Sequence, residues 1–84
     1  MDLSGAIFTD HALEQMARRQ LNQDEVRGVL NSPEEVLPDS PGRVVAQGMV
    51  GQHLFRVFVD TDRNPPEVVT VYRTSQIAKY RSQP

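Results

Sequence analysis

The sequence predicts an α+β fold in which two N-terminal helices pack on one face of an antiparallel meander sheet of three to four strands. Two observations carry this prediction. Apolar residues recur at helical spacing as far as Leu30, and from Glu35 onward they follow an extended pattern. In addition, 84 residues are enough for one hydrophobic core and too few for two. We therefore expect residues 1–84 to form a single domain.

The first helix is predicted over Asp10 to Gln20. Thr9 or Asp10 can cap its start, because a short polar side chain accepts hydrogen bonds from the free N–H groups of the first turn. The spacing separates an apolar face from a polar face. The apolar face carries Ala12, Leu13, Met16 and Ala17, and the polar face carries His11, Glu14, Gln15 and Arg18.

A second helix is predicted after a turn at Leu21. Asn22, followed three residues later by Glu25, is typical of a helix start in which side chains and backbone cap each other. Asn31, Ser32 and Pro33 end this helix. A link this short indicates that the two helices run antiparallel. The residues expected to point inward are Val26, Val29 and Leu30.

Extended segments occupy the rest of the chain, separated by turns rich in proline, glycine and aspartate. Gly51 and Gln52 are predicted to form a tight hairpin turn. After the last strand, Ser75 is predicted to cap a short helical turn that runs through Tyr80. The predicted strands are Val36–Leu37, Arg43–Val50, His53–Asp60 and Glu67–Thr74.

Alternation along the last two strands assigns side chains to two faces of the sheet. Leu54, Arg56 and Phe58 share one face of their strand, and we expect Arg56, Thr70 and Tyr72 to gather there. That face must be solvated, covered by a partner, or a functional site. The set expected to face the helices is Phe55, Val57, Val59, Val69 and Val71.

Composition excludes several classes of function. The chain has no cysteine, so disulfides and thiolate chemistry are excluded, and its two histidines lack metal-ligand spacing. We expect no metal and no cofactor. The sequence has no apolar run long enough to span a bilayer, so we expect a cytoplasmic protein without membrane contact.

The net charge of −2 conceals a gradient along the chain. Residues 1–40 carry a charge of −5 and residues 41–84 a charge of +3. An acidic total disfavours indiscriminate binding of polyanions, whereas the basic C-terminal half leaves room for a local phosphate contact. The residues expected to make that contact include Arg73 and Lys79.

Several side chains are candidates for chemistry on a phosphate. His11 lies in the first turn of the predicted helix, where an anion is favoured, although a solvated imidazole is the simpler interpretation. Arg18 and Arg19 follow on the same helix, and either one also fits an ordinary surface charge. Arg56 interrupts an apolar strand, so it needs solvent or a counter-ion such as Asp60 or Glu67. Tyr72 can pack or donate to a phosphate.

Five segments carry a family resemblance. They are His11-Ala12 with Met16, Arg19-Gln20-Leu21, Pro41-Gly42-Arg43, Arg56-Val57-Phe58-Val59-Asp60 and Val69-Thr70-Val71-Tyr72-Arg73-Thr74-Ser75. From about Phe8 to Tyr80 the chain resembles a family of small prokaryotic domains of unknown function. That family is related to RelE-like toxins, within the barnase, EndoU, colicin and RelE endoribonuclease superfamily. The resemblance implies a RelE-like fold, with two helices followed by an antiparallel sheet.

The resemblance also implies a function. It suggests a metal-independent endoribonuclease, the toxin of a toxin–antitoxin pair, with RNA and an antitoxin as partners. His11, Arg19, Arg56 and Tyr72 would be catalytic. Arg18, Thr70, Arg73 and Lys79 would bind substrate. Similar sequences often carry a basic residue where this chain has Gln15.

Two further expectations concern partners. The acidic total charge and Gln15 favour an alternative function, in which the same fold serves as a non-catalytic, regulatory or immunity-type protein-binding module. Leu54, Phe58 and Tyr72 would leave the second sheet face unusually apolar for solvent. We therefore predict a homodimer that pairs sheet faces or edge strands.

Overall fold

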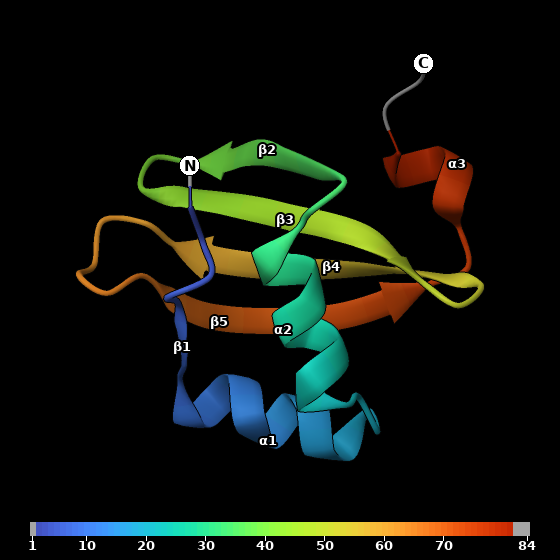
Figure 1. Ribbon diagram of the computed structural model, residues 1–84, viewed down its shortest axis with the longest axis horizontal. Coiled ribbons are helices and arrows are strands. Elements are labelled where there is room, and N and C mark those ends of the chain that lie inside the picture. Colours follow the sequence, from blue (N-terminus) through green and yellow to red (C-terminus); the bar gives the residue numbers. More distant parts are fainter. Residues whose placement is uncertain (1, 82–84) are drawn as a thin grey trace.

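The computed structural model describes residues 2–81, in which two N-terminal helices pack on a five-stranded, mostly antiparallel sheet (Figure 1). The predicted α+β class is confirmed. Strands β2 to β5 form a meander, and β1 adds to it parallel to β5, giving the order β1-β5-β4-β3-β2. The elements are β1 (Ile7–Phe8), α1 (Asp10–Arg18), α2 (Gln23–Asn31), β2 (Glu35–Ser40), β3 (Arg43–Val50), β4 (His53–Asp60), β5 (Glu67–Thr74) and α3 (Ile77–Tyr80).

The helix starts are set by side-chain caps. Thr9 Oγ1 accepts a hydrogen bond from the Ala12 N–H (3.1 Å), and Asn22 caps α2 through the N–H groups of Asp24 and Glu25. Helix α1 ends two residues earlier than predicted. Gln20 has a φ of 56°, a left-handed conformation that ends the helix and turns the chain toward α2.

The last three predicted strands have the predicted bounds, and two other details differ. Strand β2 is longer than Val36–Leu37 and includes Pro38, which is tolerated because β2 lies at the edge of the sheet. The short helical turn through Tyr80 is present. Its N-terminal cap is Gln76 instead of Ser75, and no side chain caps it.

The segment before α1 is tied down by α2, which the sequence did not predict. Arg27 Nη1 donates to the carbonyl oxygens of Ser4 (3.1 Å) and Ala6 (2.6 Å). The same guanidinium lies 4.7 Å from the centre of the Phe8 ring. In this segment Leu3 lies in the core, and backbone hydrogen bonds from Ile7 to Pro66 and from Thr9 to Val68 hold β1 beside β5.

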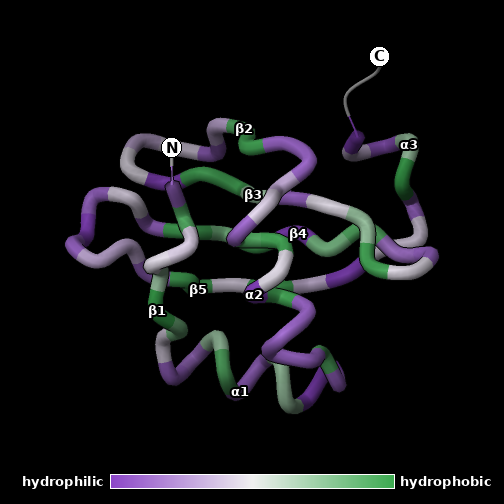
Figure 2. The backbone as a smooth tube through the Cα atoms, in the orientation of Figure 1, coloured by the Kyte–Doolittle hydropathy of each residue, from purple (hydrophilic) through white to green (hydrophobic). Residues whose placement is uncertain are grey.

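The core lies between the two helices and one face of the sheet, which we call the helix face. Figure 2 shows hydrophobic stretches along β3 and β4 in the middle of the molecule. Helix α2 packs on β3 and β4, and α1 packs along β5. The strand residues in this core include Ala46, Phe55, Val57, Val59, Val68 and Val71.

One predicted core residue is wrong. Val69 is half-buried, and Val68 takes the expected place on the helix face with no exposed surface. The cause is an irregularity in the pairing of β4 with β5, because Phe58 pairs with Thr70 whereas Val59 pairs with Val68. An extra residue in one strand reverses the alternation beyond it. The second face nevertheless keeps Thr70 and Tyr72, as predicted.

Within residues 2–81, no helix is long and apolar enough to cross a membrane.

Candidate functional site

Three neighbouring strands place polar side chains directly opposite one another on the second face of the sheet. Gln47 of β3 pairs with Arg56 of β4, and Arg56 pairs with Tyr72 of β5. Side chains at paired positions lie close enough to interact. The register therefore gathers an amide, a guanidinium and a phenol in one row.

Neutral groups hold the Arg56 guanidinium. Its Nε donates to Gln47 Oε1 (2.9 Å), and its Nη1 donates to the Tyr72 hydroxyl (2.8 Å). The counter-ions expected from the sequence are not these partners. Asp60 instead accepts a hydrogen bond from Arg43 Nε (2.6 Å). The proximity of Arg56 and Tyr72 is confirmed.

Aromatic rings surround the same guanidinium. The carbon at its centre lies 4.2 Å from the Tyr80 ring centre, 5.5 Å from Phe58 and 5.8 Å from Tyr72. Tyr72 stacks beside Phe58 and meets Tyr80 edge to face. Ring faces attract a cation, so these rings orient Arg56 without neutralising it.

Tyr80 reaches this site because α3 folds back over the second face. Gln47 Nε2 donates to the Tyr80 carbonyl oxygen (2.9 Å) and to Glu35 Oε1 (2.9 Å). Just after α3, Arg81 forms an ion pair with Glu34. Sequence reasoning missed both Gln47 and Tyr80. The sequence signal for the first was a glutamine that interrupts an apolar strand, and the structure buries it fully with its polar groups hydrogen-bonded.

The electrostatic surroundings favour ionisation of Tyr80. Hydrogen bonding with Tyr72 lowers the pKa of the Tyr80 phenol below its ordinary value, and the positive charges of Lys79 and Arg56 act in the same direction. The Lys79 ammonium lies 5.2 Å from the Tyr80 ring centre. A lowered pKa increases the fraction of this phenol that is ionised at a given pH, and only the ionised form can accept a proton.

A second cationic feature borders the row at β5. Arg19, Tyr72 and Arg73 line a pocket of about 440 Å³. Arg19 Nη1 also donates to the Val71 carbonyl oxygen (2.7 Å), so this arginine is oriented by the sheet edge. Tyr72 thus belongs both to the Arg56 cluster and to this pocket.

His11 lies elsewhere, beside Gln15 on α1. The two side-chain nitrogens Nε2 of His11 and Nε2 of Gln15 are 3.1 Å apart, and Gln15 Oε1 accepts a hydrogen bond from the Val71 N–H (3.2 Å). The prediction of Gln15 on the solvated helix face is wrong, because only 8% of it is exposed. Strand β1 ends beside Val68 and does not extend to Val71. Gln15 therefore accepts the hydrogen bond from the Val71 N–H that a longer strand would have accepted.

The remaining candidate residues differ in their surroundings. Arg18 forms an exposed ion pair with Glu14 (3.0 Å) and is separate from the Arg56 cluster. Thr70 is half-buried on the second face, opposite Phe58. Among residues 2–81 the hydrogen bonds include none between His11 and either Arg56 or Tyr72. The structure therefore gathers only part of the predicted set.

The second face is less open than the sequence suggested. Leu54 has no exposed surface, although it lies outside the core formed with α1 and α2. The chain itself covers this end of the face, whereas Phe58 and Tyr72 stay half-buried. Leu54 is therefore not part of an exposed apolar face and does not support dimerisation. The dimer stays a prediction.

No group of three or more histidine, aspartate or glutamate side chains is arranged to hold a metal ion within residues 2–81. Comparison with known proteins gives one match. Residues 8–73, most of the chain, match the family model described as a domain of unknown function (DUF4258). No curated protein and no solved structure matches the chain.

Proposed function

We propose that this chain, which belongs to the DUF4258 family, is a metal-independent endoribonuclease whose RNA site is the second face of the sheet. The observation that carries the proposal is the Arg56 guanidinium, held by neutral partners and surrounded by three rings. A guanidinium of this kind suits a phosphate oxygen, and the half-buried rings beside it suit an unstacked RNA base.

The proposed reaction needs no external nucleophile. The RNA 2′-oxygen attacks the adjacent phosphorus, so a 2′-oxygen–phosphorus bond forms and the bond from phosphorus to the 5′-oxygen breaks. One proton leaves the 2′-hydroxyl, and another is delivered to the departing 5′-oxygen. Arg56 stabilises the negative charge on the five-coordinate phosphorus, as positioned donors do in other phosphoryl and acyl transfers. The products end in a 2′,3′-cyclic phosphate and a 5′-hydroxyl.

We assign the two proton transfers to the phenols of Tyr80 and Tyr72. The lowered pKa of Tyr80 suits the group that accepts the 2′-hydroxyl proton. Tyr72 accepts a hydrogen bond from Arg56, and its own proton, which is hydrogen-bonded to Tyr80, passes to the leaving oxygen. His11 has no part in this scheme, because its side chain lies beside Gln15 and away from the Arg56 cluster. The variant His11→Ala tests its predicted role.

The kinship to RelE-like toxins, and with it an antitoxin partner, is part of the same proposal. It is supported by the resemblance of the sequence segments and by the order of two helices followed by a meander sheet. If the protein is a toxin, its induction arrests the growth of its host, and a neutralising protein binds over the second face.

The test is cleavage of RNA by the purified protein in the presence of EDTA, on total cellular RNA and on translating ribosomes. Fragments ending in cyclic phosphate are expected. Arg56→Gln should lower the cleavage rate by about 10²-fold or more, because it removes a transition-state donor. Arg63→Gln is the matched control, since Arg63 is an exposed arginine in the turn before β5. His11→Ala should leave most of the activity.

Two results would contradict the proposal. One is intact RNA in both assays, and the other is full activity of a folded Arg56→Gln variant, with folding checked by circular dichroism. Loss of activity in His11→Ala alone would return proton transfer to His11.

The alternative, a non-catalytic protein-binding module, has one specific observation in its favour. Gln15 of α1 and Arg19, the residue that follows α1, both form hydrogen bonds with the backbone of Val71 and thus have structural roles. This alternative predicts intact RNA, harmless expression and recovery of a protein partner.

A further inference from the structure

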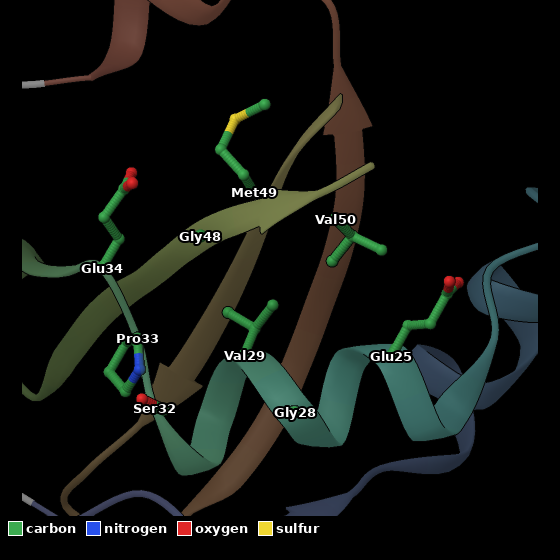
Figure 3. Close-up of a pocket in the computed structure, with 9 residues that line it drawn as sticks. All are labelled: Glu25, Gly28, Val29, Ser32, Pro33, Glu34, Gly48, Met49 and Val50. Carbon is green, nitrogen blue, oxygen red and sulfur yellow. The ribbon is translucent and has the colours of Figure 1, made fainter. Parts of the chain in front are cut away.

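A groove between α2 and β3 lies apart from the Arg56 cluster. Its volume is about 500 Å³, and its walls come from α2, the loop that follows α2, and the end of β3 (Figure 3). No residue of the proposed RNA site lines it. A function of this groove is therefore independent of the proposed nuclease.

The floor of the groove is apolar, and glycines form part of it. Figure 3 shows Val29 of α2 and Val50 of β3 pointing into the space between the two elements. Two of the lining residues, Gly28 and Gly48, have no side chain to fill it. An aliphatic side chain of suitable shape would bury apolar surface here.

Gly28 is the informative residue. It stands in the interior of α2, where glycine destabilises a helix relative to alanine. A Cβ atom at this position would meet no atom within 4 Å, and its φ is not positive. Neither packing nor backbone conformation requires the glycine, and its absent side chain keeps the groove open.

Carboxylates stand at the two ends of the groove. Figure 3 shows Glu25 on the first turn of α2 and Glu34 at the opposite end, with Val29 between them. Glu34 already binds the guanidinium of Arg81, so a basic side chain fits this rim. The Glu25 side chain is exposed. The Glu34 end is neutralised by Arg81, so the Glu25 end is the one that complements a positively charged ligand.

We propose that this groove binds a polypeptide partner through a segment that places an aliphatic side chain next to an arginine or lysine. The aliphatic group would lie on Val29 and Val50 over Gly28, and the basic group would pair with Glu25. The combination of an apolar floor and the exposed carboxylate of Glu25 selects this chemistry over an acidic or purely apolar segment.

The experiment is a titration of ¹⁵N-labelled full-length protein, followed by NMR, with the blocked peptide acetyl-Gly-Leu-Arg-Gly-amide. Saturable shifts are expected for the backbone amides of Gly28, Gly48 and Val50. The peptide with glutamate in place of arginine should bind about two- to fivefold more weakly, the range expected for one exposed ion pair. Glu25→Gln should weaken binding of the arginine peptide by a similar factor.

The variants separate binding from folding and from nuclease activity. Gly28→Leu fills the groove with a residue that favours helix, so it should fold and should weaken binding by about tenfold or more. Glu14→Gln, an exposed change on α1, should leave binding unaltered. RNA cleavage should be unchanged in all three variants. Non-saturating shifts, equal binding of the glutamate peptide, or undiminished binding to Gly28→Leu would overturn the proposal. Groove shifts that depend on protein concentration without peptide would assign the groove to a second copy and would also overturn it.

Discussion

The two faces of the sheet differ in what they bury, because the second face buries a polar side chain, Gln47, as well as the apolar Leu54. On the helix face, Val57 is fully buried among aliphatic neighbours under two nine-residue helices. On the second face, Gln47 is equally buried, yet it forms hydrogen bonds to Arg56, Glu35 and the carbonyl of Tyr80. The cover there is the four-residue α3. Equal burial therefore does not mean an equal contribution to the free energy of unfolding. Hydrophobic burial supplies most of that free energy, whereas a network of hydrogen bonds adds little to it, because the same groups bind water in the unfolded chain.

The largest expected effect tests the helix face. Leu30→Ala removes a side chain that is 1% exposed and should lower the free energy of unfolding by about 2–5 kcal/mol. Urea denaturation measures this change. Val36→Ala is the control, since Val36 is 37% exposed and its loss should change stability by no more than about 0.5 kcal/mol. A loss at Leu30 no larger than at Val36 would refute the assignment of the core.

A smaller effect is expected on the second face. Gln47→Ala leaves the Nε of Arg56 and the carbonyl of Tyr80 without their partner, which should cost about 1–3 kcal/mol. The same variant should cut RNA cleavage, whereas a folded Leu30→Ala protein keeps it. Gln52→Ala, in the exposed hairpin turn, is the control for both readouts. If Gln47→Ala costs as much as Leu30→Ala, the proposed division between the faces is wrong.

The smallest effect concerns pH. Because the pKa of Tyr80 is lowered in the folded protein, the unfolded chain binds more protons in the pH range just below the ordinary tyrosine pKa. Stability should therefore rise slightly with pH through that range. Phenolate absorbance should show Tyr80 ionising below the ordinary tyrosine pKa, and Tyr72→Phe should return Tyr80 toward that pKa. An ionisation of Tyr80 at the ordinary pKa would contradict this prediction.

The sequence predicted the helix face well and the second face only in part. The strands His53–Asp60 and Glu67–Thr74 have strong alternation and clear flanking turns, so their bounds were correct. The choice of Val69 over Val68 as the residue that faces the helices was wrong. Both are valine, and no pattern in the sequence reveals where the extra residue lies in the pairing of β4 with β5. Alternation did place Arg56 beside Tyr72.

Two other features depend on contacts between distant segments. Tyr80 joins the site only because Gln47 binds its carbonyl group, 33 residues away in sequence. Gln15 turns inward because β1 is only two residues long and leaves the backbone N–H of Val71 without a strand partner. The Gln15 side chain accepts that hydrogen bond instead. Local periodicity contains no information about an unpaired backbone group in another element. His11 was grouped with Arg56 by the family resemblance and not by periodicity.

The hydrogen bonds from α1 to Val71 also bear on aggregation. An unpaired strand edge is a template to which another chain can add, and repeated addition produces fibres. Gln15 and Arg19 occupy both backbone groups of Val71, so an incoming strand must first displace α1. At the opposite margin, Pro38 lacks an N–H donor and the pairing of β2 is irregular nearby. Both margins of the sheet thus resist fibre growth, one by a helix and the other by a proline.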